Sequence, residues 1–184
     1  MSCYSDITTG LIMAVTIDII DQDIFKALVV FFRTFLPIGT EVVQAQDNLV
    51  AMPKGGFVAM NNTGMNRLSF NVDTYNSALQ QKSILTPTRY VVQLDFYGPL
   101  SQIWAMETQA LFRDEYATDL FPANIQPLYA DDPVQLPLID GEQQYEQRWK
   151  LEGNLQYNPT LTTSQQSMLD VVVGLAPIDQ TFQP

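Results

Sequence analysis

Histidine is entirely missing from this sequence of 184 residues. It is the commonest general base and the commonest transition-metal ligand in proteins, so its absence excludes the usual Ser/His and Cys/His nucleophile pairs. Carboxylate or lysine chemistry and oxygen-only calcium or magnesium sites remain open. Because no motif for any of these is present, we predict a protein that is not an enzyme, with no catalytic residue, no metal site and no cofactor.

Cysteine and basic residues are also scarce. Cys3 is the single cysteine, so no disulfide framework or thiolate zinc site is expected, which fits a reducing compartment such as the cytoplasm. Nine Lys and Arg stand against twenty Asp and Glu, a net charge of -11, and they form no stripe that would grip nucleic-acid phosphates. An acidic surface serves solubility, and it also repels DNA that has to slide past without sticking.

Long hydrophobic runs are absent as well. The apolar segment 10–15 is short, follows Asp6 rather than a basic region and lacks a cleavage site, so we expect no signal peptide. The segment 27–32 is too short to cross a bilayer and is flanked by Lys26 and Arg33. We therefore predict no membrane-spanning segment.

The patterns that are present predict two helices in one domain. A first helix begins at Asp21, which can cap it, and ends before Pro37. A second opens at Gly98-Pro99 and ends between residues 118 and 122. Its expected buried side consists of Leu100, Ile103, Trp104, Leu111 and Phe112.

Strand patterns surround these helices. Residues 52–75 predict a β-hairpin, with strands at 57–60 and 66–75 joined by an Asn/Gly loop at 61–64. Further strands are expected at 41–46, 88–97, 144–157 and 168–173, and the strand at 144–157 is long enough to extend beyond its own sheet. Segments 76–87 and 122–140 are expected to be connections.

The predicted fold class is therefore α+β. We expect a single domain with a mixed, mainly antiparallel β-sheet flanked by two helices, in the order α-β-β-β-α-β-β. The expected boundaries are an N-terminal arm at 1–16, the domain at 17–175 and a C-terminal tail at 176–184.

Two short motifs suggest chemistry that their surroundings do not support. Asp131 and Asp132 are adjacent carboxylates, but neighbours on an extended segment point to opposite sides, so turn or capping roles are favoured over a metal site. Lys54 precedes Gly55-Gly56 without the spacing of a phosphate-binding loop, which favours a simple turn.

A family resemblance appears in a series of short sequence motifs. From about residue 17 to the end, their order and spacing resemble the neck or tail-terminator proteins of tailed bacteriophages. These motifs are MPKG at 52–55, RLS at 67–69, NVDTY at 71–75, PTRYVVQLD at 87–95, YGPL at 97–100, LFRDEY at 111–116, QPLYADDP at 126–133 and GEQQYEQRW at 141–149.

The resemblance implies a structural protein of the virion, made in the host bacterial cytoplasm. Such a protein forms a hexameric ring, a homo-oligomer that stops growth of the tail tube and docks the tail to the head-completion connector proteins. The tail tube protein, the connector and the tail sheath are the implied partners, and DNA passes only as cargo without sequence-specific binding or any membrane contact. It also implies an α+β subunit with a mixed sheet flanked by helices.

A closed ring of identical subunits needs two different patches on each subunit. The surplus apolar surface of the first helix and the long strand at 144–157 are candidate patches. Isolated charges are candidates for pairing with a neighbouring subunit, although local pairing is an equal alternative. These candidate interface residues are Lys54, Arg67, Arg89, Asp131, Asp132 and Arg148.

Two other functions compete with this one. A different head-tail connector or a baseplate protein would share the architecture and differ in its position in the virion. A carboxylate-dependent hydrolase, such as a glycosidase, would need an acid in an aromatic-lined cleft, for which Asp95 or Glu107 near Trp104 is the candidate.

Overall fold

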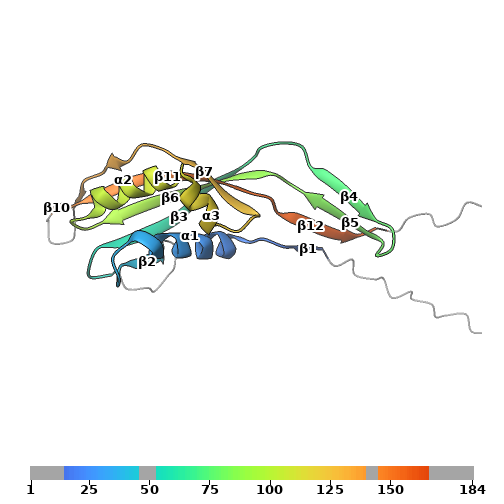
Figure 1. The fold of residues 1–184 in the computed structure, drawn as a ribbon, viewed down its shortest axis with the longest axis horizontal. Coiled ribbons are helices and arrows are strands. Elements are labelled where there is room, and N and C mark those ends of the chain that lie inside the picture. Colours follow the sequence, from blue (N-terminus) through green and yellow to red (C-terminus); the bar gives the residue numbers. More distant parts are fainter. Residues whose placement is uncertain (1–14, 46–52, 140–144, 166–184) are drawn as a thin grey trace, which may run out of the picture.

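The computed structural model describes residues 15–45, 53–139 and 145–165, and it combines three helices with two larger β-sheets (Figure 1). The helices are α1 (Asp21–Phe35), α2 (Ser101–Leu111) and α3 (Glu115–Leu120). The strands are β1 (Thr16–Ile17), β2 (Glu41–Gln44), β3 (Phe57–Arg67), β4 (Val72–Asn76), β5 (Gln81–Leu85), β6 (Thr88–Tyr97), β7 (Ile125–Ala130), β8 (Val134–Gln135), β9 (Leu138–Ile139), β10 (Tyr145–Glu146), β11 (Arg148–Tyr157) and β12 (Thr160–Ser164).

The strands form two sheets of different character. The main sheet has the order β2-β3-β6-β11-β7, with β8 also on β11, and only the β2–β3 pair is parallel. The second sheet has the order β1-β12-β5-β4 and is antiparallel throughout. Figure 1 shows this second sheet at the far end of the molecule from β2 and β10, beyond the helices, so we call it the projecting sheet. The predicted α+β class with a mixed, mainly antiparallel sheet is confirmed.

The helices pack on one face of the main sheet, which we call the helix-covered face. Strand β6 alternates as expected, and Tyr90, Val92, Leu94 and Phe96 are all fully buried there. The opposing strand β11 adds Leu151 and Leu155 to the same face, since they lie opposite Leu94 and Tyr90. This alternation predicts burial correctly because one side of the sheet meets an apolar layer.

The ring of Phe31 holds the helix layer together. It is fully buried on α1, and its centroid lies 5.5 Å from that of Phe112 and 5.7 Å from that of Phe121. Phe112 in turn presses on β11 at Gly153, where an added Cβ would lie 3.2 Å from the Phe112 ring. A glycine in this strand therefore creates the space in which α2 meets the sheet.

One antiparallel ladder passes through both sheets. Thr88 faces Tyr157 in the main sheet, and Leu85 faces Thr160 in the projecting sheet, so the register is the same on both sides of Pro87 and Pro159. Between them the Thr86 N–H donates to the Pro159 carbonyl at 3.1 Å. The strand predicted at 144–157 therefore does continue, through Pro159, into a second sheet.

The predicted hairpin at 52–75 is wrong. Residues 57–67 form one strand, β3, because its whole length pairs with β6 and a bulge between Asn62 and Gly64 absorbs the Asn/Gly segment. The Asn62 Oδ1 accepts from the Gly64 N–H at 2.9 Å, so the expected turn chemistry operates inside a strand. The hairpin is formed instead by β4 and β5, and β5 lies in the segment 76–87 that was expected to be a connection.

Three other expectations need correction. The second helix is two helices, because Asp114 caps α3 by accepting from the Tyr116 N–H at 2.9 Å. Leu100 and Ile103 are exposed rather than buried. The segment 122–140 contains β7, because pairing with β11 outweighs its prolines.

The first helix ends as predicted, but Ile20 rather than Asp21 is its cap residue, with Asp23 accepting from the Ile20 N–H. The strand expected at 168–173, the tail at 176–184 and most of the arm lie outside the described residues.

The buried phenols of Tyr90 and Tyr157 generate a prediction. Burial raises the pKa of both hydroxyls above their usual range, and the nearby Asp21 carboxylate adds to the rise. The unfolded chain releases these protons near pH 10 while the folded chain keeps them, so the free energy of unfolding falls as the pH rises above about 10.

We expect Tyr90→Phe to weaken that alkaline fall and, near neutral pH, to raise the free energy of unfolding by about 1 kcal/mol. The reason is that the Tyr90 hydroxyl has no hydrogen-bond partner in the described part of the chain. Tyr157→Phe is the matched control, since its hydroxyl donates to the Met65 Sδ at 3.1 Å and its loss should destabilise. Urea titrations from pH 7 to 11 measure both, and equal losses in the two variants would contradict this account.

Candidate assembly surfaces

The projecting sheet has one apolar face. Ile17 lies opposite Leu161, and Leu161 lies opposite Ile84, so three apolar side chains form a row across three strands. Tyr75 belongs to the same face in the adjacent row. None of these four residues belongs to the described hydrophobic core, and Ile17 is 54% exposed. We call this surface the apolar face of the projecting sheet.

The other face of the projecting sheet carries mainly hydroxyl groups, together with Val72 and Leu85. Thr16, Thr162, Ser83 and Thr74 form a row across all four strands. The sheet is therefore amphipathic, with the alternation that normally marks a sheet packed on a core. In the described part of the chain, however, the helices cover the main sheet and supply no layer for this one (Figure 1).

Charge is nearly absent from the projecting sheet. Residues 68–87 and 160–165 contain one acid, Asp73, and one base, Lys82. These two side chains form an ion pair of 2.7 Å on the apolar face. The sheet is thus electrically neutral in a chain of net charge -11.

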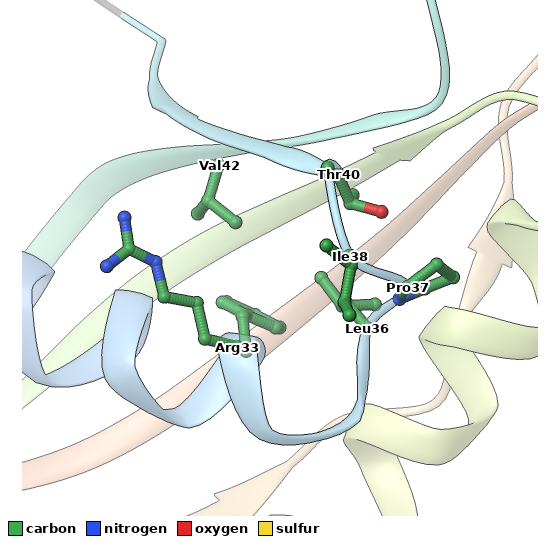
Figure 2. Close-up of a pocket in the computed structure, with 8 residues that line it drawn as sticks. Arg33, Leu36, Pro37, Ile38, Thr40 and Val42 are labelled. Carbon is green, nitrogen blue, oxygen red and sulfur yellow. The ribbon is translucent and has the colours of Figure 1, made fainter.

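A second surface lies between α1 and β2, and we call it the α1–β2 groove. One hollow of about 410 Å³ is lined by the end of α1 and the following turn, including Leu36, Ile38 and Val42 (Figure 2). A neighbouring hollow of about 500 Å³ shares Arg33 and Val42 with it and adds Val29 and Val30. Figure 2 shows Arg33 rising from α1 near Val42.

The groove contains an arginine without a partner among the described residues and a half-exposed valine. Arg33 has no hydrogen bond or ion pair with any described residue, while Lys26 at the other end of the groove is paired with Asp23 at 3.2 Å. Val30 is 52% exposed on the outer side of α1. The groove therefore combines exposed apolar surface with a positive charge that no described residue pairs.

The open face of the main sheet, opposite the helices, carries a buried ion pair. The Arg148 Nη2 lies 3.0 Å from the Asp95 Oδ1, and the Gln93 Nε2 donates to the Asp95 Oδ2 at 2.7 Å. The Arg148 guanidinium also lies over the ring of Tyr97, which stacks on Phe57 with a centroid distance of 4.4 Å. Arg148, a candidate interface residue, is thus paired within its own chain.

The acid cleft required by the hydrolase alternative does not form around Asp95. Asp95 lies on the open face of the main sheet, whereas Trp104 packs on the helix-covered face against Gly56. An added Cβ on Gly56 would lie 2.7 Å from the Trp104 ring, so packing against Trp104 accounts for the second of the two glycines after Lys54. Glu107 is exposed on α2.

The other candidate interface residues do not gather in one site. Lys54 precedes β3 and Arg67 ends it, and both are exposed without an ion-pair partner among the described residues. Arg89 is half-buried and donates through Nη1 to the Tyr129 hydroxyl at 3.4 Å.

Asp131 and Asp132 follow β7 and are exposed, and the Asp132 Oδ1 accepts from the Gln109 Nε2 at 2.6 Å. Among the described residues, no group of three or more Cys, Asp or Glu side chains is placed to hold a metal ion.

Sequence reasoning missed the apolar face of the projecting sheet, although the alternation of Lys82 and Ile84 with Ser83 between them was a signal for a strand.

Comparison with known proteins assigns the family. The model of the phage neck terminator proteins matches residues 22–181, which is most of the chain. The chain belongs to the phage neck terminator protein family. This membership is consistent with the prediction of a structural protein rather than an enzyme. It confirms the family resemblance of the short sequence motifs.

One solved structure shows a remote likeness to this neck terminator. It is the sheath/tube terminator of an extracellular contractile injection system, PVC, solved by cryo-EM in the extended state. The sequence identity is 11% and the TM-score 0.48, with 89% of this chain and 64% of that chain covered, which is too distant to carry an argument. No curated protein sequence matches this chain. Within the described residues, no helix has the length and apolar content needed to cross a bilayer.

The pairing of Asp95 with Arg148 generates a stability prediction. Asp95 is 4% exposed, so its removal leaves a half-buried guanidinium without its carboxylate. We expect Asp95→Ala to lower the free energy of unfolding by about 3 kcal/mol. Lys54→Ala is the control and should change it by less than about 0.5 kcal/mol. Chemical denaturation measures both, and a neutral Asp95→Ala would show that the pair does not stabilise the open face.

Proposed function

We propose that this protein is the subunit of a hexameric ring at the top of a phage tail, where it ends the tail tube and joins it to the head-completion connector. Family membership over residues 22–181 supports the position in the neck. The apolar face of the projecting sheet, which no described segment covers, supports a subunit that completes itself by assembly. The tail sheath is a further proposed partner.

The acidic balance of the chain agrees with a passage for DNA. A ring wall of net charge -11 per subunit repels phosphates and would let DNA pass as cargo. We propose no sequence-specific contact with DNA and no membrane contact. In this proposal the subunit is made in the bacterial cytoplasm and ends in the virion.

Electron microscopy of the purified protein, alone and mixed with tail tubes, tests the proposal. We expect open-centred rings or a cap at one end of each tube, because the family role requires a terminus that the tube cannot extend. Class averages give the copy number, and antibody labelling of virions gives the position. A particle that ignores tubes and labels a baseplate would overturn the proposal in favour of another structural role.

The charge of Arg67 offers a second test of the assembly. Arg67 is exposed and unpaired among the described residues, so Arg67→Glu should leave the fold intact. If this residue meets a neighbour's carboxylate, the reversal should reduce ring yield on tubes about tenfold at low salt and less at high salt. Gln102→Glu is the control for an added negative charge, since Gln102 is exposed on α2 and is not a candidate interface residue. Undiminished assembly of Arg67→Glu would remove Arg67 from the interface.

A further inference from the structure

We propose that the apolar face of the projecting sheet of one copy docks in the α1–β2 groove of the next copy. This inference rests on the proposed ring and names the two surfaces that meet in it. The occupant of the groove is therefore a second copy of this chain. The contact is heterologous, since two different surfaces of the same subunit take part.

The need for a covering partner follows from the construction of the projecting sheet. Four short strands carry an apolar row of Ile17, Leu161 and Ile84 that contributes nothing to the described core. A small sheet gains its independent stability from an apolar face that packs against another layer. In the described part of the chain the helices cover only the main sheet, and the proposal assigns the missing layer to another molecule.

Electrostatics favours a second copy as the partner. Two chains of net charge -11 repel each other, so they approach most easily where charge is lacking. The projecting sheet is that place, because its single acid, Asp73, is already paired with Lys82. A strongly basic partner would instead select an acidic surface, which the projecting sheet does not provide.

The α1–β2 groove offers this face apolar surface and a positive charge. It is a concave surface lined by Val29, Val30 and Val42, so it offers apolar area to an apolar row. Its Arg33 has no partner among the described residues, whereas the apolar face holds one half-exposed carboxylate, that of Asp73. Docking would bring the neighbour's Arg33 to the Asp73–Lys82 pair, where its guanidinium gains a carboxylate partner.

The positions of the two surfaces lead to a chain of contacts rather than a closed pair. Figure 1 shows the projecting sheet at one end of the molecule and the C-terminal part of α1 with β2 toward the other. A copy that uses its sheet on one neighbour still has its groove free for another. Such head-to-tail contacts propagate and close into a ring when the rotation between copies allows it.

Two variants with matched controls test the contact. Ile17→Glu places a charge on the apolar face, and Thr16→Glu places the same charge on the hydroxyl face one residue away in the same strand. Val30→Glu charges the groove, and Ile103→Glu is its control, because both side chains are 52% exposed on helices. We expect Ile17→Glu and Val30→Glu each to weaken self-association about a hundredfold, measured by mass photometry or on tail tubes, with both controls near wild type.

Mixing the two defective variants gives a sharper result. The Ile17→Glu copy keeps an intact groove and the Val30→Glu copy keeps an intact sheet, so the mixture should form heterodimers that stop at two copies. A sheet-to-sheet contact would instead leave Val30→Glu fully able to assemble, and that result would overturn the proposal. Circular dichroism melts of all four variants show whether each copy is folded before it is scored.

The outcomes separate this inference from the proposed ring. If Ile17→Glu and Val30→Glu both cap tubes as rings like wild type, the inference is wrong while the ring stands. If wild type forms no ring with or without tubes, the proposed function fails first. Exchanging the two charges tests the contact directly. Arg33→Asp should impair assembly, and the double variant Arg33→Asp with Asp73→Arg should improve assembly about tenfold over Arg33→Asp alone. A double variant that assembles no better than Arg33→Asp would contradict the contact.

Discussion

The whole molecule depends on one antiparallel ladder that runs through both sheets without a change of register. Its two strands are β5 with β6 and β11 with β12, and each contains a proline where the sheets meet. Proline has no N–H to donate, so the two prolines remove backbone hydrogen bonds where the sheets meet. The Thr86 N–H still donates to the Pro159 carbonyl. This ladder fixes where the projecting sheet stands relative to the core.

The two sheets differ in whether a helix layer covers their apolar face. The main sheet buries its apolar side under helices that pack around Phe31. The projecting sheet has the same amphipathic alternation but no helix layer in the described chain. In the proposed ring, burial of this face against a second copy would add to the stability of the assembled subunit.

The elements that sequence reasoning predicted well are those whose pattern is decided locally. Strand β6 alternates because one side is buried, and α1 ends before Pro37 because proline cannot continue a helix. Both elements can therefore be predicted from the sequence. The hairpin at 52–75 was wrong because Asn62 and Gly64 make a bulge only when a long partner strand is present. The candidate charges were dispersed for a related reason, since the pairing of Arg148 with Asp95 depends on cross-strand register.

The shared register of the two sheets also has a mechanical consequence. Hydrogen bonds in an antiparallel pair lie perpendicular to the strands, so a pull along the strands shears many of them at once instead of opening them one by one. A pull on the projecting sheet along β5 and β12 would therefore load β6 and β11 in the core. In the proposed ring, this pair of strands would carry a mechanical load from one copy to the next.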